Sequence, residues 1–416
     1  MAHFFIWAIA ALSIALMLIR PFRIPEVVWT AAGALLLIAS RLIAWRLAAH
    51  AVAEGLDVYL FLTGMMLLSE LARAHGVFDW LAGIAVEQAN GSSARLFTLI
   101  YAVGTVVTAL MSNDATAVVL TPAVLTAVKR AQARPMPSLL TCALIANAAS
   151  FVLPISNPAN LVVFHANMPP LGRWLAMFAV PSLVSIVVTY LALRWFSRRD
   201  LSEPCHAADG DHRLTTAGKI SLYGILSVAV VLLIASALHK DLGLPTCLAA
   251  LVVTAVVVAY ERASPVPLMR EISWSVLPLV AALFIIVEAV KTAGALEMLH
   301  AVFVHAMQWP ATASTLAVGG LIGFGTNLVN NLPLGLIAGA TLQTVAAHAA
   351  LSKAVLIGVD LGPNLSITGS LATILWLIAI RREGLQVSAG QFLKAGLIIM
   401  PPALMLALAA GCWIGR

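Results

Sequence analysis

Long apolar segments, separated by short polar ones, dominate the pattern of the chain. In the first half, segments long enough to span a membrane cover about residues 3–19, 26–44, 56–73 and 171–196, because a bilayer core about 30 Å thick needs roughly 20 apolar residues per helix. A weaker amphipathic segment, residues 77–89, is typical of a helix that lies along the membrane interface. The pattern predicts a polytopic membrane protein built from helices.

One apolar stretch, residues 96–128, is interrupted by Ser112, Asn113 and Asp114. An Asp in the apolar centre of a bilayer costs about 2.5 to 3.5 kcal/mol, so it normally faces a cavity or a partner. Ser, Asn and Asp also begin helices, because their side-chain oxygens accept the free N–H groups of the first turn. The stretch predicts a re-entrant helical hairpin, which is tolerated where protein or water surrounds its tip.

A second kind of interruption lies in residues 138–165, where Pro154 and Pro158 flank a polar segment. Each proline removes a backbone donor and clashes with the preceding turn, so a continuous helix is not expected. We predict a membrane span broken into two half-helices, with Asn157 and Asn160 at the break. The polar stretch 197–217, rich in Arg, Asp, His and Pro, is predicted to be a cytoplasmic linker.

The second half of the chain repeats the first. One constant offset, which we call the repeat offset, pairs Glu70 with Glu288 and Asn113 with Asn331, and a slightly smaller offset pairs the break at 153–157 with residues 365–369. The sequence therefore predicts a second hairpin in residues 312–348 and a second broken span in residues 353–380. Their polar residues are Asn327, Asn330 and Asn331 in the hairpin, and Asp360, Asn364 and Thr368 in the broken span.

Counting the crossings determines how the two halves are related. Residues 1–196 would form the first membrane repeat and residues 218–416 the second, each with five spans and one hairpin. Because five is odd, the second repeat must enter the membrane from the opposite side. The predicted fold is an all-α inverted repeat with about ten spans and two hairpins, an architecture common among secondary transporters. Most Lys and Arg residues then fall on one side, which predicts that this side is cytoplasmic and that both termini lie outside.

Composition agrees with a membrane transporter rather than an enzyme. Hydrophobic residues make up 61% of the chain and charged residues 10%, and the mean hydropathy is +0.99, outside the range of soluble domains. The net charge of +6 would suit nucleic acid, but the basic residues lie between apolar segments, so no nucleic-acid partner is expected. The four cysteines are scattered without C-x-x-C spacing, so neither a zinc site nor another cofactor is expected.

The four polar interruptions are predicted to converge, and their chemistry limits the cargo. They are rich in Asn, Ser and Thr and contain no Lys, Arg or His, which disfavours a strongly anionic solute. Asp114 and Asp360 supply two acids, and a carboxyl group in a poorly hydrated cavity can alternate between its protonated and ionised forms. This lining fits a small, hydroxyl-bearing solute that is neutral or weakly acidic, and Na⁺ fits nearly as well.

At these positions the chain resembles the ArsB-type arsenite efflux proteins of the ion transporter superfamily. The resemblance covers essentially the whole chain in length, order and repeat plan. The segments that carry it are Asn113-Asp114 with Leu120-Thr121-Pro122, Asn330-Asn331-Leu332-Pro333, Gly358 to Asn364 and Gly369 to Trp376.

That resemblance implies export of arsenite and antimonite, as neutral trihydroxides, across the cytoplasmic (inner) membrane. Export would be driven by proton influx and is sometimes energised by a soluble ArsA-type ATPase. Mapped onto this sequence, the resemblance places Asn113, Asp114, Asn330, Asn331 and Asp360 in the transport cavity.

The predicted site combines this mapping with the polar interruptions. Asp114 and Asp360 are the candidate proton-coupling residues. The candidate substrate-binding residues are Ser112, Asn113, Asn157, Asn160, Asn327, Asn330, Asn331, Asn364 and Thr368. A Na⁺/H⁺ antiporter on the same scaffold is an alternative function, and a transporter of dicarboxylates or other anions is a less favoured one. Glu70 and Glu288 each precede a basic residue by three positions and are interpreted as structural ion pairs, whereas the role of Asn147 stays open.

Overall fold

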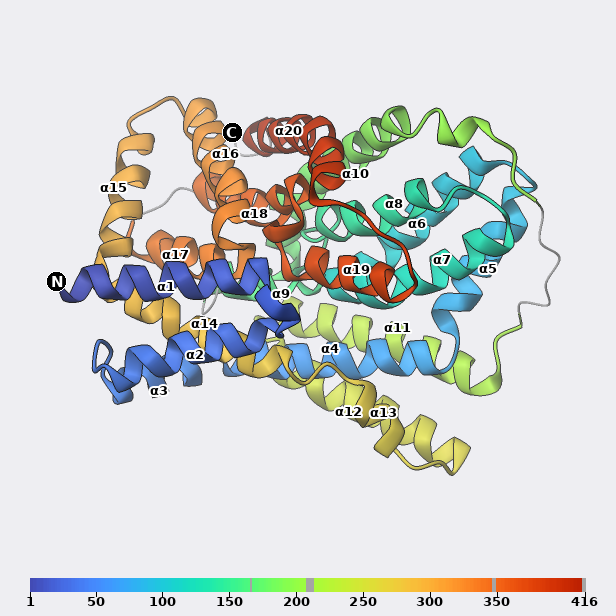
Figure 1. The fold of residues 1–416 in the computed structure, drawn as a ribbon, viewed down its shortest axis with the longest axis horizontal. Coiled ribbons are helices and arrows are strands. Elements are labelled where there is room, and N and C mark those ends of the chain that lie inside the picture. The colour runs from blue at the N-terminus through green and yellow to red at the C-terminus, as the bar shows by residue number, and fades with distance from the viewer. Residues whose placement is uncertain (165–166, 207–212, 346–348, 414–416) are drawn as a thin grey trace.

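The computed structural model describes residues 1–164, 167–206, 213–345 and 349–413. His165 and His348, the predicted ends of the first broken span and the second hairpin, lie outside the described residues, as do residues 207–212 of the linker. Within the described ranges all regular secondary structure is helical, and one isolated bridge joins Ser92 to Pro204. The predicted all-α fold is confirmed (Figure 1).

Within the described residues, ten α-helices precede the linker. They are α1 (Ala2–Ile19), α2 (Glu26–Ala39), α3 (Trp45–Glu54), α4 (Leu56–Ala74), α5 (Val77–Ala89), α6 (Ser93–Leu110), α7 (Thr121–Arg130), α8 (Pro135–Ala148), α9 (Pro158–Phe164) and α10 (Leu171–Phe196).

Ten more helices follow the linker in the part of the chain that the structure describes, in a matching order. They are α11 (Thr216–Ala237), α12 (Gly243–Glu261), α13 (Val266–Glu271), α14 (Val276–Val290), α15 (Leu296–Met307), α16 (Ala311–Val329), α17 (Asn331–Thr344), α18 (Ala349–Leu361), α19 (Leu371–Arg382) and α20 (Ala389–Trp413).

Helix by helix, the second half repeats the first in the opposite direction. The repeat offset pairs Ser93, where α6 begins, with Ala311, where α16 begins. In Figure 1, α4 runs toward the right-hand end, where the linker between α10 and α11 lies, whereas α14 runs toward the left-hand end, where the N-terminus lies. Opposite directions of matching helices are what an inverted repeat requires.

Eight of the described helical segments are long and apolar enough to cross a membrane, or nine if the bent pair of α3 and α4 counts as one span. Other apolar helices, among them α2 and α8, are shorter. The hairpins and broken spans divide the apolar sequence into shorter pieces. The chain is therefore a multi-pass membrane protein.

The two hairpins turn at the predicted polar residues, for local reasons that the sequence supplies. In the first, Ser112 Oγ accepts the backbone N–H of Ala115 at 3.2 Å, and a π-helical turn at Ala115–Leu120 leads into α7. In the second, Asn330 ends α16 with a φ of +76° and a ψ of 152°, a strained backbone conformation that residues other than Gly rarely adopt. Its Oδ1 accepts the N–H of Leu332 at 3.3 Å and so starts α17.

Both broken spans are interrupted where proline or glycine prevents a continuous helix. The first half-helices end at Ala148 and Leu361, and the second half-helices begin at Pro158 and Leu371. The ends of the half-helices are therefore related by an offset that is one residue larger than the offset that pairs the two breaks in the sequence. The second break also lies very close to α16: a Cβ atom on Gly362 would lie 2.2 Å from the carbonyl oxygen of Gly323.

Candidate functional site

A small cavity lies where the two hairpin tips approach the two broken spans. Its polar wall comes from all four elements: Asn113 and Asp114, Asn331, Asn157, and Ser370. The rest of its described wall is apolar, formed by Leu62, Pro158, Val276, Val280, Leu332, Leu371 and Ala372. No Lys, Arg or His is among these described lining residues, so the cavity offers hydrogen-bonding groups and one carboxyl group.

Asn113 and Asn331, one from each repeat, both line this cavity. Both side chains are buried, and the Oδ1 atom of each has no hydrogen-bond partner within the described structure. A buried polar atom without a partner costs about 1 to 3 kcal/mol. Two free acceptor oxygens in one wall therefore favour a solute that donates hydrogen bonds, or a cation.

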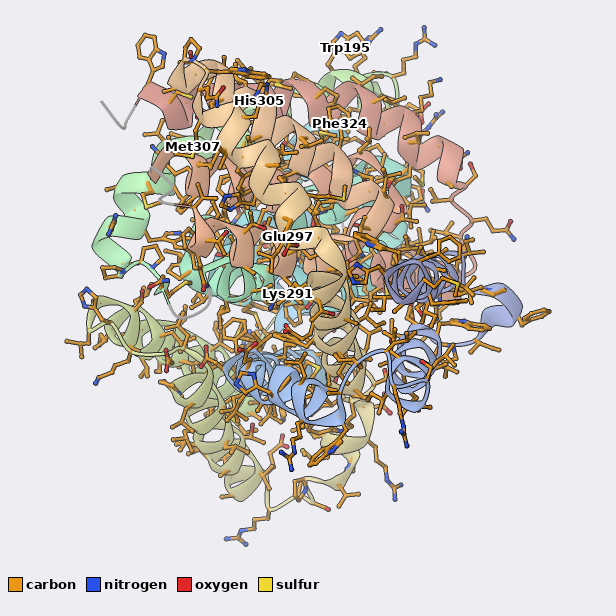
Figure 2. The ribbon with its side chains drawn as sticks, turned by 90° about the vertical axis from the view of Figure 1, so that its left-hand side faces the viewer. Trp195, Lys291, Glu297, His305, Met307 and Phe324 are labelled. Carbon is orange, nitrogen blue, oxygen red and sulfur yellow. The ribbon has the colours of Figure 1, made fainter. Side chains whose placement is uncertain are left out.

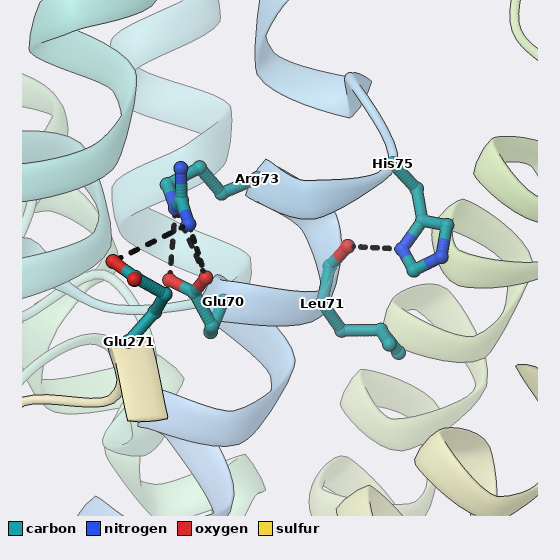
Figure 3. A network of polar contacts seen from close by, with 5 residues as sticks. All are labelled: Glu70, Leu71, Arg73, His75 and Glu271. Carbon is teal, nitrogen blue, oxygen red and sulfur yellow. Dashed lines mark hydrogen bonds and ion pairs between the residues drawn. The ribbon is translucent and has the colours of Figure 1, made fainter. Parts of the chain in front are cut away.

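Asp114 lies between the small cavity and a wider one, because it lines both. The wider cavity has a volume of about 1360 Å³, including the space open to solvent, and reaches a charged mouth. At this mouth Arg73 Nε donates to the two carboxylate oxygens of Glu70 at 3.1 and 2.9 Å. Arg73 Nη2 also lies 4.0 Å from Glu271 of α13 (Figure 3). The predicted pair at Glu70 thus forms part of the mouth of a cavity.

A third cavity, of about 630 Å³, is the repeat-related counterpart of the wide one. Glu288 and Lys291, the residues that the repeat offset pairs with Glu70 and Arg73, line it, and Lys291 Nζ donates to Glu288 Oε2 at 2.5 Å. Figure 2 looks onto the end of the molecule opposite the linker, with Lys291 near the middle of the view. Residues near the linker-side end of α4 line the wide cavity, and residues near the opposite end, where α14 ends, line the third one (Figure 1). The two cavities therefore lie toward opposite ends of the molecule, and the one on the linker side is larger.

Each broken span is held by a side chain from the other. Asn157 begins α9 by accepting the N–H of Ala159 at 3.0 Å, and its Nδ2 donates to Asp360 Oδ1 at 2.8 Å. Ser370 begins α19 by accepting the N–H of Thr373 at 3.2 Å, and its Oγ donates to Asn147 Oδ1 at 3.3 Å. The two repeats thus make the same crossed contact twice.

Several predicted site residues support the breaks instead of lining a described cavity. Asn160 Nδ2 donates to the carbonyl oxygens of Ser150, Leu153 and Pro154 at 2.9 to 3.3 Å. Asn327, Asn330 and Thr368 likewise bond the backbone around the second hairpin and break. Asn364 donates to the carbonyl oxygen of Leu144 in the first broken span. Asp360 is fully buried behind Asn157 and is absent from the described cavity walls. Of the predicted residues, Ser112, Asn113, Asp114, Asn157 and Asn331 line a cavity.

Some residues of the site were not expected from the sequence. Ser370 was not among the candidates, although its place directly before the apolar run of α19 is that of an N-cap. Glu271 and Arg382 at the wide mouth also went unnoticed, because they lie far from the hairpins in sequence. Only the folded chain brings them to the same cavity.

Comparison with known proteins agrees with this geometry. The profile of the citrate transporter family, CitMHS, matches residues 4–359. The chain belongs to the CitMHS family.

The relatives of this CitMHS-family chain include proteins named arsenical pump membrane proteins. An arsenical pump membrane protein of Yersinia enterocolitica is 28% identical, over 88% of this chain and 87% of that protein. One from Escherichia coli is 26% identical over 97% of both chains. The predicted likeness to ArsB-type proteins is therefore confirmed, and the chain is a membrane transporter.

A solved structure supports the fold of this CitMHS-family chain. The YdaH transporter of Alcanivorax borkumensis, described as having an unusual topology, matches with a TM-score of 0.55. The match covers 88% of this chain and 86% of that one at 14% sequence identity. At this identity the likeness concerns the fold alone.

Proposed function

We propose that the chain exports arsenite and antimonite, as neutral trihydroxides, from the cytoplasm in exchange for protons that enter. The observation that carries the proposal is that Asn113 and Asn331 line one cavity and each has an amide oxygen without a hydrogen-bond partner in the described structure. A trihydroxide donates three hydrogen bonds, and these oxygens can accept two of them. The names of the relatives, arsenical pump membrane proteins, point to the same cargo.

Asp114 and Asp360 are the proposed proton carriers. Asp114 is accessible from the wide cavity, where water can exchange protons with its carboxyl group. Asp360 contacts the small cavity through Asn157. A protonated and an ionised carboxyl group interact differently with the inward-open and outward-open states, and such differential binding is what shifts a population between two conformations.

The proposed orientation puts the linker in the cytoplasm and both termini outside, in the inner membrane. Residues 1–196 and 218–416 are then the two repeats, and the wide cavity is the cytoplasmic entrance of an inward-open state. The excess of Lys and Arg on the linker side supports this orientation. A soluble ArsA-type ATPase would have to dock on the same cytoplasmic side, which includes residues 197–217.

Everted membrane vesicles test the function. We expect ATP-energised vesicles to accumulate arsenite and antimonite, and a protonophore to abolish the accumulation. Asp114→Asn should abolish it as well, with the protein still present in the membrane. Unchanged accumulation in this variant would remove Asp114 from the mechanism.

A Na⁺/H⁺ antiporter is the second candidate, because the same oxygens could coordinate Na⁺. Growth of a pump-deficient host on arsenite, compared with growth on high salt, separates the two functions. Rescue on salt alone would favour Na⁺.

The family description raises citrate as a third candidate. The described wall of the small cavity lacks a cationic side chain, and a tricarboxylate would meet Asp114 there. Arg73 and Arg382 lie at the wide mouth instead, each with an acid nearby in the same wall. Competition of citrate with arsenite uptake tests this candidate, and we expect none.

A further inference from the structure

Asn147 and Asp360 occupy the same place in the two repeats. Each is the second-last residue of the first half-helix of a broken span, since α8 ends at Ala148 and α18 at Leu361. The offset between them is the one that also relates Asn157 to Ser370 and the ends of the half-helices. Each accepts a hydrogen bond from the residue that begins the other repeat's second half-helix.

The two positions differ in how well their side chains are satisfied. Asn147 Nδ2 donates to Asn364 Oδ1 at 3.0 Å, and Asn147 Oδ1 accepts from Ser370 at 3.3 Å. Asp360 accepts from Asn157 through Oδ1 and has the Ser150 hydroxyl close to its carboxylate, but its buried Oδ2 has no well-formed hydrogen bond in the described structure. The basic residue of α18, Lys353, lies about two helical turns away and donates to the carbonyl oxygen of Gly411 at 2.6 Å.

The chemical difference between the side chains matches this difference in bonding. A carboxamide has nearly the shape of a protonated carboxylic acid but cannot gain or lose a proton near neutral pH. A buried carboxylate without a cation is expensive to keep ionised, and within the described structure no salt bridge reaches Asp360. The hydrogen-bond partners of both positions are uncharged.

We propose that the two repeats divide one role between these positions. Asp360 takes up and releases a transported proton at its free Oδ2 atom. Asn147, whose carboxamide has nearly the shape of a protonated acid, carries no proton and keeps its hydrogen bonds at every pH. Asn157 is the positioning residue, because it lines the small cavity and bonds Asp360 at the same time. This inference rests on the proposed proton-coupled export and specifies which position of a symmetric pair carries the proton.

The test is the ratio of protons to arsenite in proteoliposomes, measured as the arsenite gradient at which net arsenite flux reverses under a set pH gradient. We expect Asp360→Asn to keep arsenite–arsenite exchange while the reversal point becomes less dependent on the pH gradient. Asn147→Asp should make it more dependent, and the double variant Asn147→Asp/Asp360→Asn should recover coupling by moving the acid to the matching position. Ser227→Ala, on α11 and outside the described cavity walls, adds no acid and should leave the ratio unchanged.

Two outcomes would overturn the inference while arsenite exchange is intact. One is a wild-type ratio in Asp360→Asn, and the other is an unchanged ratio in Asn147→Asp.

A cargo-independent readout covers the case in which arsenite is not the substrate. Infrared difference spectra between acid and neutral pH should lose a carboxyl band in Asp360→Asn and gain one in Asn147→Asp. Identical spectra in the wild type and Asp360→Asn would refute the role of Asp360 whatever the cargo is. Absence of arsenite exchange in the wild type, with these band changes present, would refute the proposed cargo alone.

Discussion

Asn113 and Asn331, which the repeat offset pairs, line one cavity, and the amide oxygen of each lacks a hydrogen-bond partner within the described structure. Because the two residues come from different hairpin tips, a solute that bonds both joins the two repeats. The cavity is therefore a point at which cargo can influence how the halves pack.

Replacing either asparagine should weaken cargo binding more than folding. Asn113→Ala or Asn331→Ala removes one acceptor, and a net hydrogen bond is worth about 0.5 to 1.5 kcal/mol, so the KM for arsenite should rise about 2- to 12-fold. Gln343→Ala is the control, since Gln343 lines the opposite cavity. The KM of this variant for arsenite should not change. Initial uptake rates in vesicles measure both, and equal KM values in all three variants would contradict the assignment.

Asn160 should behave in the opposite way. Its Nδ2 satisfies carbonyl oxygens that the first break leaves without helical partners, so Asn160→Ala should lower the free energy of unfolding by about 1 to 3 kcal/mol. A lower melting temperature in detergent, with an unchanged KM in the protein that remains folded, is the expected result. Full stability combined with a raised KM would instead make Asn160 a cargo ligand.

The unequal cavities predict one-sided accessibility. Val118 lines the wide cavity, and Leu336, its partner at the repeat offset, lines the smaller counterpart. In a cysteine-free background, a membrane-impermeant thiol reagent should label Val118→Cys from the cytoplasmic face of everted vesicles. It should label Leu336→Cys only from the other face, and more slowly. Labelling of both from the same face would rule out the inverted arrangement proposed for the membrane.

Close packing at the second break predicts that adding one methyl group there lowers the free energy of unfolding. In Gly362→Ala the new Cβ would meet Gly323 at 2.2 Å, and overpacking of this kind costs about 1 to 3 kcal/mol. Gly172→Ala is the matched control, because a Cβ there meets nothing within 4 Å. Thermal unfolding of the two variants should separate them, and equal melting temperatures would show that α16 and the break can move apart without loss.

Elements with a strong local signal could be predicted from the sequence. Proline, glycine and clusters of Asn, Ser and Asp interrupt apolar runs, so the hairpins and broken spans were recognisable, and the repeated order of charges revealed the second copy. The short helices α3 and α13 were missed, since at ten and six residues they are too brief and too polar for a search based on membrane spans.

Whether a polar side chain points into a cavity or toward the backbone of a break could not be predicted in the same way. A broken helix needs polar groups to satisfy its freed backbone, and a transport site needs polar groups to hold cargo, so the two uses look alike in sequence. Asn364 bonds the carbonyl oxygen of Leu144, whereas Asn157 faces a cavity, yet both are asparagines in a break. Only the three-dimensional packing separates them.

The crossed contacts also have a consequence for biogenesis. As the chain leaves the ribosome, Asn147 and Asn157 enter the lipid long before Ser370 and Asp360 are made. Until then the first broken span lacks these hydrogen-bond partners. The wait is long, because Asn157 and Asp360 are separated by 203 positions in the sequence and Asn147 and Ser370 by 223. A nascent chain arrested before α18 should therefore be a better target for membrane proteases than the finished protein.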